Sequence, residues 1–332
     1  MENLRFELGK HCFRPEDPCR ICAIVNVTPD SFSDGGQWDT TEKAVQHALS
    51  VLQQGADMLD IGGESTRPGS HYVEIDEEIH RVVPVIEALR KKTDCLISVD
   101  TWKAPVAKAA LEAGADIIND ITGLIGDPDM AKVVAEHNAG LIAMFNPVVL
   151  RPDHPNSKKF PSFGDGAAFT KEEKKAAAEE KDILVLLKQY LDRSLSLAKD
   201  VGIPKEHIML DPGIGFGLSK RDNLRLIQHL PDLHAQGYAV FLGVSRKRFI
   251  VNMLQEAEFN VDAETEAGFR NRDAASAVLT ALAAREGVEV VRVHSVEEHR
   301  MATLVADAVR LADAQEDINF GSYQKQEMWR SI

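Results

Sequence analysis

The chain alternates between short β-branched runs and longer amphipathic segments along nearly its whole length. We interpret eight apolar runs as strands, at residues 21–27, 58–62, 96–100, 117–121, 140–145, 208–211, 240–244 and 290–294. The segments between them carry apolar residues at helical spacing, most clearly at residues 41–54, 75–92, 105–112, 183–200 and 296–314. This alternation predicts an α/β fold, a single-domain (β/α)8 TIM barrel, with an open doubly wound sheet as the alternative.

Two segments interrupt the alternation, at residues 147–178 and 254–272. Insertions longer than about a dozen residues are usually functional lids or mobile surface, and we expect one of these roles for each. We place the barrel at residues 21–315, with residues 1–20 as an N-terminal extension. Residues 316–332 form a C-terminal tail that we expect to be poorly ordered.

Composition excludes several classes of protein. Hydrophobic residues make up 44% of the chain and charged residues 27%, which is typical of soluble globular proteins. No apolar run approaches the ~20 residues of a membrane span, and the N-terminus lacks the layout of a secretion signal. We therefore expect a cytoplasmic protein without membrane partners. The net charge of −14 argues against a nucleic-acid partner, so an anionic substrate would need a locally basic site.

Cysteines could form a metal site. Cys19 and Cys22 have CxxC spacing, and His11 and Cys12 lie upstream, so a zinc site is conceivable. However, Cys22 falls within a predicted strand and no second CxxC follows. We interpret the cysteines as reduced structural thiols.

Polar residues follow nearly every predicted strand, at the end where barrels of this class carry their chemistry. Because alternate strand residues face the same way, Arg292 and His294 point to one side together. With Arg67 and Lys247 they are predicted to form a cationic cluster. Phosphate or pyrophosphate is the natural ligand of such a cluster, because arginine binds it bidentately.

An acidic group ends three other strands. Asp100, Asn119 and Asp211 offer two carboxylates and a carboxamide, which suit a flat heterocycle with amine and ring N–H donors, or equally a metal ion. Each aspartate taken alone could be a helix cap or turn residue. The glycine-rich DPGIGFGL does not fit a dinucleotide-binding motif, because its third glycine has the wrong spacing. It is more typical of a flexible loop that carries Phe216.

Seven motifs in order, from about residue 21 to 313, resemble the dihydropteroate synthases of folate biosynthesis: NVTPDSFSDGG, DIGGESTRPGS, ISVDTWK, IINDITG, LDPGIGFG, GVSRKRF and VVRVH. The resemblance implies condensation of 6-hydroxymethyl-7,8-dihydropterin diphosphate with p-aminobenzoate, which gives 7,8-dihydropteroate and pyrophosphate. A dissociative, SN1-like step is expected. Family members are generally homodimers, require Mg²⁺ and are targets of sulfonamides, which compete with p-aminobenzoate.

The resemblance also implies roles for single residues. The pterin would contact Asp100, Asn119, Met144, Asp211, Lys247 and Arg292. Pyrophosphate would contact Asn26, Thr66, Arg67, Arg292 and His294, with Mg²⁺ on Asn26. The p-aminobenzoate would lie near Phe32, Thr66, Pro68, Phe216, Lys247 and Arg248, with Phe32 on a mobile cover of the site. Catalytic roles fall to Asp100, Lys247, Arg292 and His294.

The sequence departs from the family pattern in two places. AMFNPVVLRPDHP replaces a Met-His motif after the fifth strand, and Arg248 replaces a second serine. Two other functions stay open. A pterin-binding methyltransferase domain has no use for a pyrophosphate cluster. A non-catalytic pterin-binding paralogue would have lost at least one of Asn26, Asp100, Lys247 and His294.

Overall fold

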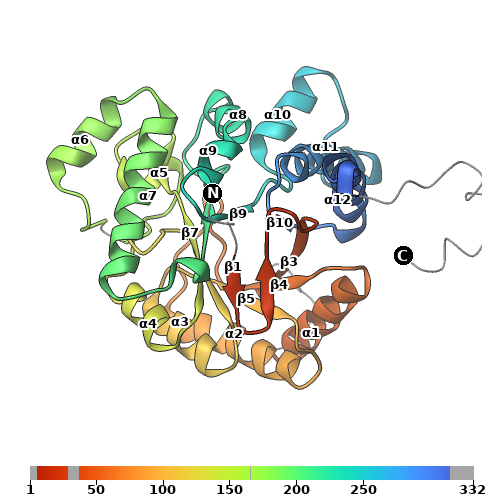
Figure 1. Ribbon diagram of the computed structural model, residues 1–332, viewed down its shortest axis with the longest axis horizontal. Coiled ribbons are helices and arrows are strands. Elements are labelled where there is room, and N and C mark those ends of the chain that lie inside the picture. Colours follow the sequence, from red (N-terminus) through yellow and green to blue (C-terminus); the bar gives the residue numbers. More distant parts are fainter. Residues whose placement is uncertain (1–5, 29–36, 165, 315–332) are drawn as a thin grey trace, which may run out of the picture.

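The computed structural model describes residues 6–28, 37–164 and 166–314. In these residues eight parallel strands close into a barrel in the order β10-β3-β4-β5-β6-β7-β8-β9, with helices around it (Figure 1). The strands are β3 (Arg20–Asn26), β4 (Met58–Gly62), β5 (Leu96–Asp100), β6 (Ile117–Asp120), β7 (Gly140–Met144), β8 (Ile208–Asp211), β9 (Ala239–Leu242) and β10 (Val290–Val293). The predicted single-domain TIM barrel is confirmed, and the open sheet is wrong.

The helices follow the predicted periodicity. They are α1 (Gln37–Gln53), α2 (Ile75–Arg90), α3 (Ala104–Glu112), α4 (Met130–Glu136), α5 (Pro147–Leu150), α6 (Lys171–Glu179), α7 (Ile183–Asp200), α8 (Lys220–Gln228), α9 (Leu230–His234), α10 (Arg248–Glu256), α11 (Glu266–Arg285) and α12 (Val296–Arg310). Short 3₁₀ turns lie at Ser157–Lys159, Lys205–His207 and Ala312–Ala314. The five predicted helices are all present, and their ends differ from the predicted ends by at most a few residues.

The core has two parts. The larger one fills the space between the outer surface of the strands and the helices, and includes Ile21, Leu59 and Val85. Complete burial of one such side chain stabilises the fold by about 1.5–3 kcal/mol. The smaller part fills the interior of the barrel at the N-terminal ends of the strands, with Met58 and Phe241 among its members.

A hairpin of β1 (Phe6–Leu8) and β2 (His11–Phe13) closes this N-terminal end of the barrel. Phe6 and Phe13 join the interior core, with their ring centroids 5.5 Å apart. In Figure 1, β1 is seen across the centre of the ring of helices. The hairpin lies within residues 1–20, which sequence analysis treated only as an extension. Its apolar residues are too few to signal strands in the sequence alone.

The cysteines are all free thiols. Cys19 belongs to the outer part of the core and Cys22 to the barrel interior, so their side chains do not converge on one ion. Burial raises the pKa of both thiols well above its usual value, which keeps them protonated. In the described ranges no group of three or more His, Cys, Asp or Glu side chains is placed to hold a metal ion.

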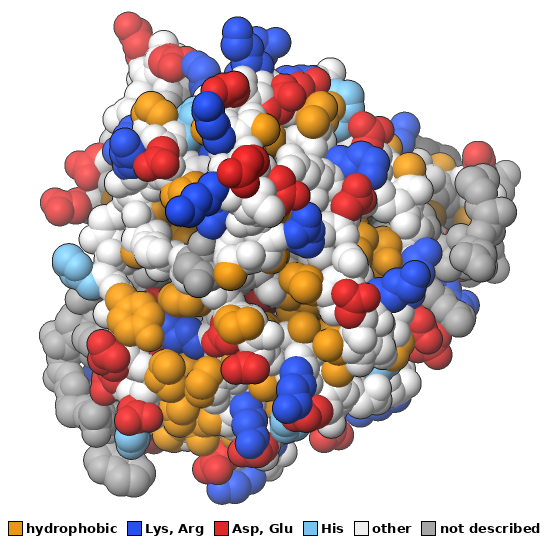
Figure 2. All heavy atoms as spheres, turned by 90° about the vertical axis from the view of Figure 1, so that its left-hand side faces the viewer, with side chains coloured by type: hydrophobic (Ala, Val, Ile, Leu, Met, Phe, Trp, Pro, Cys, Tyr) orange, Lys and Arg blue, Asp and Glu red, His pale blue; other side chains and the backbone are white. Residues whose placement is uncertain are grey.

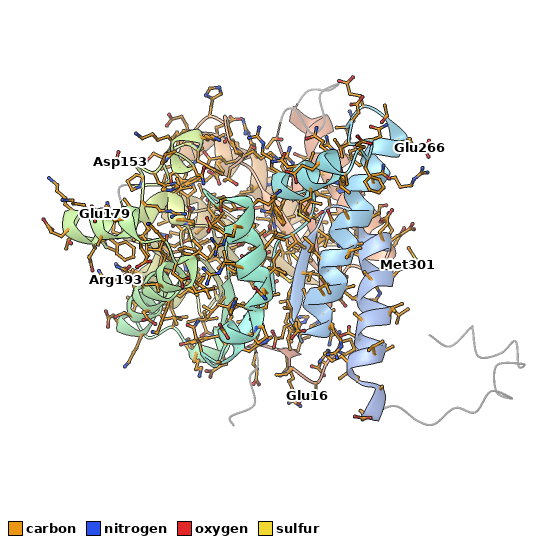
Figure 3. The ribbon with its side chains drawn as sticks, turned by 90° about the horizontal axis from the view of Figure 1, so that it is seen from above. Glu16, Asp153, Glu179, Arg193, Glu266 and Met301 are labelled. Carbon is orange, nitrogen blue, oxygen red and sulfur yellow. The ribbon has the colours of Figure 1, made fainter. Side chains whose placement is uncertain are left out.

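Residues 147–178 contribute α5, a 3₁₀ turn and most of α6. In Figure 3, Asp153 of this insertion lies near one end of the molecule, and Glu16, just after β2, lies at the opposite end. This part of the insertion therefore lies towards the C-terminal ends of the strands. Phe163, within it, is only 2% exposed. Phe163 thus packs on the barrel, and the role of the insertion as lid or mobile surface stays a prediction.

The outer surface carries both signs of charge. On the face drawn in Figure 2, Lys and Arg side chains are interspersed with Asp and Glu and do not form a continuous basic patch. Within the described part of the chain, no helix is long and apolar enough to cross a membrane. The cytoplasmic location stays a prediction.

Candidate active site

A cavity of about 970 Å³ opens at the C-terminal ends of the strands. It is lined by thirteen of the residues that the sequence predicted for the site: Asn26, Thr66, Arg67, Pro68, Asp100, Asn119, Met144, Asp211, Phe216, Lys247, Arg248, Arg292 and His294. The remaining one, Phe32, and the predicted mobile cover around it lie outside the described residues. Parallel strands bring these residues together because their carboxyl ends meet at one rim of the barrel.

Arg292 forms the floor of the cavity with two carboxylates. Its Nε donates to Asp60 Oδ2 at 2.5 Å, and its Nη2 donates to Asp100 Oδ2 at 2.7 Å. Asp60 is completely buried and also accepts from Ser98 Oγ at 2.6 Å and from Asn119 Nδ2 at 3.2 Å. Burial by itself lowers the pKa of Arg292, but the two carboxylates raise it above its usual value, so the guanidinium stays charged.

The acidic residues of the site hold their protons unusually tightly. Burial raises the pKa of Asp100 to about 7, although the Arg292 charge opposes this shift. Burial also raises the pKa of Asp211 to about 6, against a hydrogen bond from the backbone of Gly213 and the charge of Lys247. Both carboxyls can therefore switch between proton donor and acceptor near neutral pH. A heterocycle with mixed donors and acceptors can use either state.

Lys247 enters the cavity from the loop after β9. The preceding residue, Arg246, has a left-handed backbone with φ of 55°, and its guanidinium donates to both Asp273 oxygens at 2.6 and 2.9 Å. This bidentate pair ties the loop to α11. Lys247 Nζ lies 5.1 Å from the centroid of the Phe216 ring. Burial lowers the pKa of Lys247 to about 8, and Asp211 opposes the shift. The charge of Lys247 is thus sensitive to a nearby anion.

His294 lies just after β10 and is held by Ser245. The Ser245 oxygen lies 3.0 Å from Nδ1 and accepts from the His294 backbone N–H at 3.2 Å. Burial lowers the pKa of His294 well below its usual value, and the nearby charges of Arg246 and Arg292 lower it further. The imidazole is therefore neutral near pH 7. The predicted cationic cluster is wrong in this respect, because His294 carries no charge and Arg292 is already balanced by carboxylates.

A buried lysine supports the loop after β4, which carries Thr66, Arg67 and Pro68. Lys103 Nζ lies 3.1 Å from Glu64 Oε1 and 2.7 Å from Glu78 Oε2. Trp102 Nε1 donates to the other Glu64 oxygen at 2.9 Å. The cluster joins α2 to the loops after β4 and β5, and so fixes where Arg67 enters the cavity.

Comparisons with known proteins place the chain. A family model described as pterin-binding enzyme matches residues 22–294. A dihydropteroate synthase of Bacillus subtilis is 39% identical over 289 residues, 87% of this chain and 88% of that protein. Two solved structures are also similar. The Xanthomonas albilineans dihydropteroate synthase with 4-aminobenzoic acid is 37% identical over 93% of this chain and 98% of its own, with a TM-score of 0.74. The Yersinia pestis dihydropteroate synthase with a sulfonamide drug is 30% identical over 93% of this chain and 100% of its own, with a TM-score of 0.74.

The chain belongs to the dihydropteroate synthase family of pterin-binding enzymes.

Sequence reasoning missed several residues of this dihydropteroate synthase family site. Asp60 was given no role, although alternation along β4 places it on the same side as Met58, inside the barrel. Asn156, Lys159 and Phe160 also line the cavity. They come from the insertion, where the family pattern is absent, so no signal in the sequence could have found them.

Proposed function

We propose that the protein is a dihydropteroate synthase, which joins 6-hydroxymethyl-7,8-dihydropterin diphosphate to p-aminobenzoate. The observation that carries the proposal is one cavity in which buried carboxyl groups lie beside the charged groups of Lys247 and Arg292. Carboxyl groups suit the amine and N–H groups of the pterin, and cationic groups suit the diphosphate. The pterin and the diphosphate of this one substrate thus each meet complementary groups in the same cavity.

The proposed roles follow from these contacts. Asp100, Asn119 and Asp211 hold the pterin edge, with Met144 against its face. Lys247 is proposed to lie between the pterin and the diphosphate, because Asp211, Arg292 and Arg67 are all close enough to shift its pKa. Arg67, Arg292 and the neutral His294 receive the diphosphate, and Thr66 contributes a hydroxyl. Diphosphate binding competes with Asp60 and Asp100 for the guanidinium of Arg292.

The proposed reaction is dissociative and SN1-like. The bond between the pterin methylene carbon and the diphosphate oxygen breaks, and its electron pair leaves with pyrophosphate. The dihydropterin ring stabilises the methylene cation, and the amine nitrogen of p-aminobenzoate then forms the new C–N bond and loses one proton to water. Arg67, Lys247 and Arg292 favour this step, because they meet the negative charge that develops on the leaving group. An aromatic amine needs no strong general base.

We also propose Mg²⁺ as the cofactor, on Asn26. The Asn26 carboxamide ends β3 at the cavity and makes no hydrogen bond to any group that the structure describes. Mg²⁺ typically binds one or two protein oxygens together with substrate phosphates and water, so this single oxygen fits such an ion. When bound, Mg²⁺ supplies charge that stabilises the departing pyrophosphate.

The p-aminobenzoate is proposed to lie against Phe216 and Pro68, with its carboxylate toward Arg248. Phe32 is proposed for the same subsite on the family pattern. Sulfonamides have a similar flat arylamine and are proposed to compete there. A methyltransferase domain would leave Arg67 and Lys247 in the cavity without a ligand. A non-catalytic paralogue is disfavoured, because Asn26, Asp100, Lys247 and His294 are all retained.

A homodimer is proposed through the outer faces of α11 and α12, which pack side by side (Figure 1). These faces expose an apolar patch of Val278, Leu282, Met301, Leu304, Val305 and Val309. Met301 lies on the outer side of α12 in Figure 3. Contiguous exposed apolar side chains are characteristic of association surfaces. Sedimentation analysis of the protein and of Val305→Glu tests this, and a monomeric wild type would exclude it.

The test of the proposed function is an assay with both substrates. Purified protein with the pterin diphosphate, p-aminobenzoate and Mg²⁺ should release pyrophosphate and form dihydropteroate, and product should require both substrates. Folded protein that forms no dihydropteroate would exclude the proposal. Product formation from methyltetrahydrofolate and a corrinoid acceptor would instead support the methyltransferase alternative.

A further inference from the structure

The insertion after β7 delivers an aromatic ring to the cavity. Phe160 lines the cavity beside the loop that follows β8. Its ring is stacked on the Phe216 ring, with centroids 5.8 Å apart and planes at 26°. Such a near-parallel aromatic pair contributes about 0.5–1.5 kcal/mol beyond its burial. The position of Phe216 against the ligand space therefore depends on Phe160.

The Phe160 segment is anchored on both sides of the cavity. The Gly69 backbone N–H, in the loop after β4, donates to the Lys159 carbonyl at 3.1 Å. The buried Arg151 donates Nη2 to the Gly217 carbonyl, in the loop after β8, at 3.3 Å. The insertion thus bridges the two loops that flank the proposed acceptor position, through one backbone carbonyl and one arginine side chain.

Phe163 makes further aromatic contacts that hold the insertion in place. Phe163 packs edge-on against Trp102 at 6.3 Å and against Phe216 at 6.4 Å. Trp102 is itself held by Glu64. Phe160 is only half-buried, whereas Phe163 is enclosed by its neighbours. Phe163 therefore belongs to the packing of the insertion, and Phe160 is the one of the two that lines the cavity.

We propose that Phe160 is a specificity-determining residue of the acceptor subsite. With Phe216 it forms an aromatic wall that selects a flat, narrow arylamine. Exposed Lys159, next to it, and Arg248 on the same cavity match an acid group on that acceptor. The inference rests on the proposed function and deepens it, because it assigns acceptor choice to a segment that the family motifs do not include.

The experiment compares the wild type with Phe160→Ala and Phe160→Leu in the full chain, with Mg²⁺ and the pterin diphosphate saturating. The acceptors are p-aminobenzoate and 4-amino-3-methylbenzoate. Phe160→Ala should raise KM for p-aminobenzoate about 10-fold and leave KM for the pterin diphosphate within about twofold. The preference for p-aminobenzoate over the methylated acceptor should fall about fivefold or more. The site can reject one extra methyl group only if the aromatic side chain that it would contact is held in place. The KM for p-aminobenzoate and the acceptor preference of Phe160→Leu should lie between those of the wild type and Phe160→Ala.

The matched control is Phe259→Ala, since Phe259 is 56% exposed and does not line this cavity. It should leave both Michaelis constants unchanged. Unchanged acceptor KM and preference in Phe160→Ala would overturn the proposal. An equal rise in KM for both substrates, with a lower melting temperature, would show a structural role only and would also overturn it.

Failure of the proposed function gives a different result. A wild type that forms no dihydropteroate would remove the synthase assignment. Calorimetric titration with p-aminobenzoate alone and with bound pterin diphosphate then tests Phe160 without turnover. Weaker arylamine binding by Phe160→Ala, with Phe259→Ala unchanged, would keep Phe160 as a ligand-selecting residue. Equal binding by both variants would overturn it. If Phe160→Ala does not fold, Phe160→Leu carries the same comparison.

Discussion

Arg292 and Asp100 are 192 residues apart in the sequence, yet Nη2 of one donates to Oδ2 of the other at 2.7 Å on the floor of the cavity. Asp60 holds the same guanidinium from a third strand. The proposed pterin and pyrophosphate subsites are thus joined by one side chain.

Replacing Arg292 should cost stability as well as activity. Arg292→Leu leaves Asp60 and Asp100 buried without their cationic partner, and breaking a buried pair costs about 3–5 kcal/mol. Urea unfolding at pH 7.5 should show this loss. The double variant Asp60→Asn/Arg292→Leu should recover part of it, because one uncompensated carboxylate is removed. Equal stability of Arg292→Leu and wild type would contradict the described ion-pair network.

Lys247→Ala should behave in the opposite way. Its ammonium is desolvated in the empty site, so truncation should leave the free energy of unfolding nearly unchanged or slightly higher. The rate of dihydropteroate formation should fall by roughly 100-fold or more, as for other charge-stabilising donors. The control is Lys199→Ala, at an exposed position on α7. Steady-state kinetics and urea unfolding of both variants measure activity and stability separately. A marked loss of stability in Lys247→Ala would refute the prediction.

Asp100 should make the stability of the empty enzyme fall as pH rises. Its pKa is raised from 3.8 to about 7 in the folded state, so folded protein binds this proton more tightly than unfolded protein does. The stabilising contribution is complete below the unfolded pKa and is lost as pH rises through about 7. One such group changes stability by at most about 1.4 kcal/mol per pH unit.

The measurement is the free energy of unfolding of wild type and Asp100→Asn between pH 5 and 8. Asp120 and Asp211, each with a pKa of about 6, and Lys247, with a pKa of about 8, also titrate in or near this window and are present in both proteins. The difference between the two curves should therefore follow Asp100, with the wild type losing stability relative to the variant as pH rises. A difference that is flat with pH would contradict the raised pKa.

Gly213→Ala should be far more damaging than Gly202→Ala. Both glycines have left-handed backbones, with φ of 71° and 81°. A Cβ at Gly213 would lie 1.8 Å from the Phe145 carbonyl oxygen, whereas a Cβ at Gly202 meets nothing within 4 Å. Gly202→Ala should cost only the backbone strain of about 1–2 kcal/mol. Thermal unfolding should show a much larger loss for Gly213→Ala, and similar losses for the two would refute the close approach.

Replacing Asn26 should raise the Mg²⁺ concentration that the enzyme requires and leave its stability unchanged. Because its carboxamide bonds to no described group, Asn26→Ala should keep the wild-type melting temperature. The Mg²⁺ concentration for half-maximal activity should rise roughly 10-fold, as expected when a group that supports the metal is lost. Asn26→Asp keeps an oxygen ligand and should need less Mg²⁺ than Asn26→Ala. Identical Mg²⁺ dependence of all three proteins would remove Asn26 from the metal site.

Much of the fold could be predicted because it depends on local pattern. β-branched runs and helical periodicity alternate along the chain, and eight successive strand–helix units typically close into a barrel. The same regularity predicted the cavity, since Asn26, Asp100 and Asp211 end parallel strands and must meet at one rim. Phe32 was implied only by the family resemblance and lies outside the described residues, so its role stays a prediction.

Local sequence pattern was thus enough to predict the barrel, the end of it that carries the site and most of the residues there. The charge states of these residues depend on the folded chain, because burial and distant partners set each pKa. The tertiary structure neutralised His294, paired Arg292 with Asp60 across 232 residues, and brought Phe160 against Phe216. These effects depend on three-dimensional distance and loss of water, and no repeating pattern in a sequence encodes either.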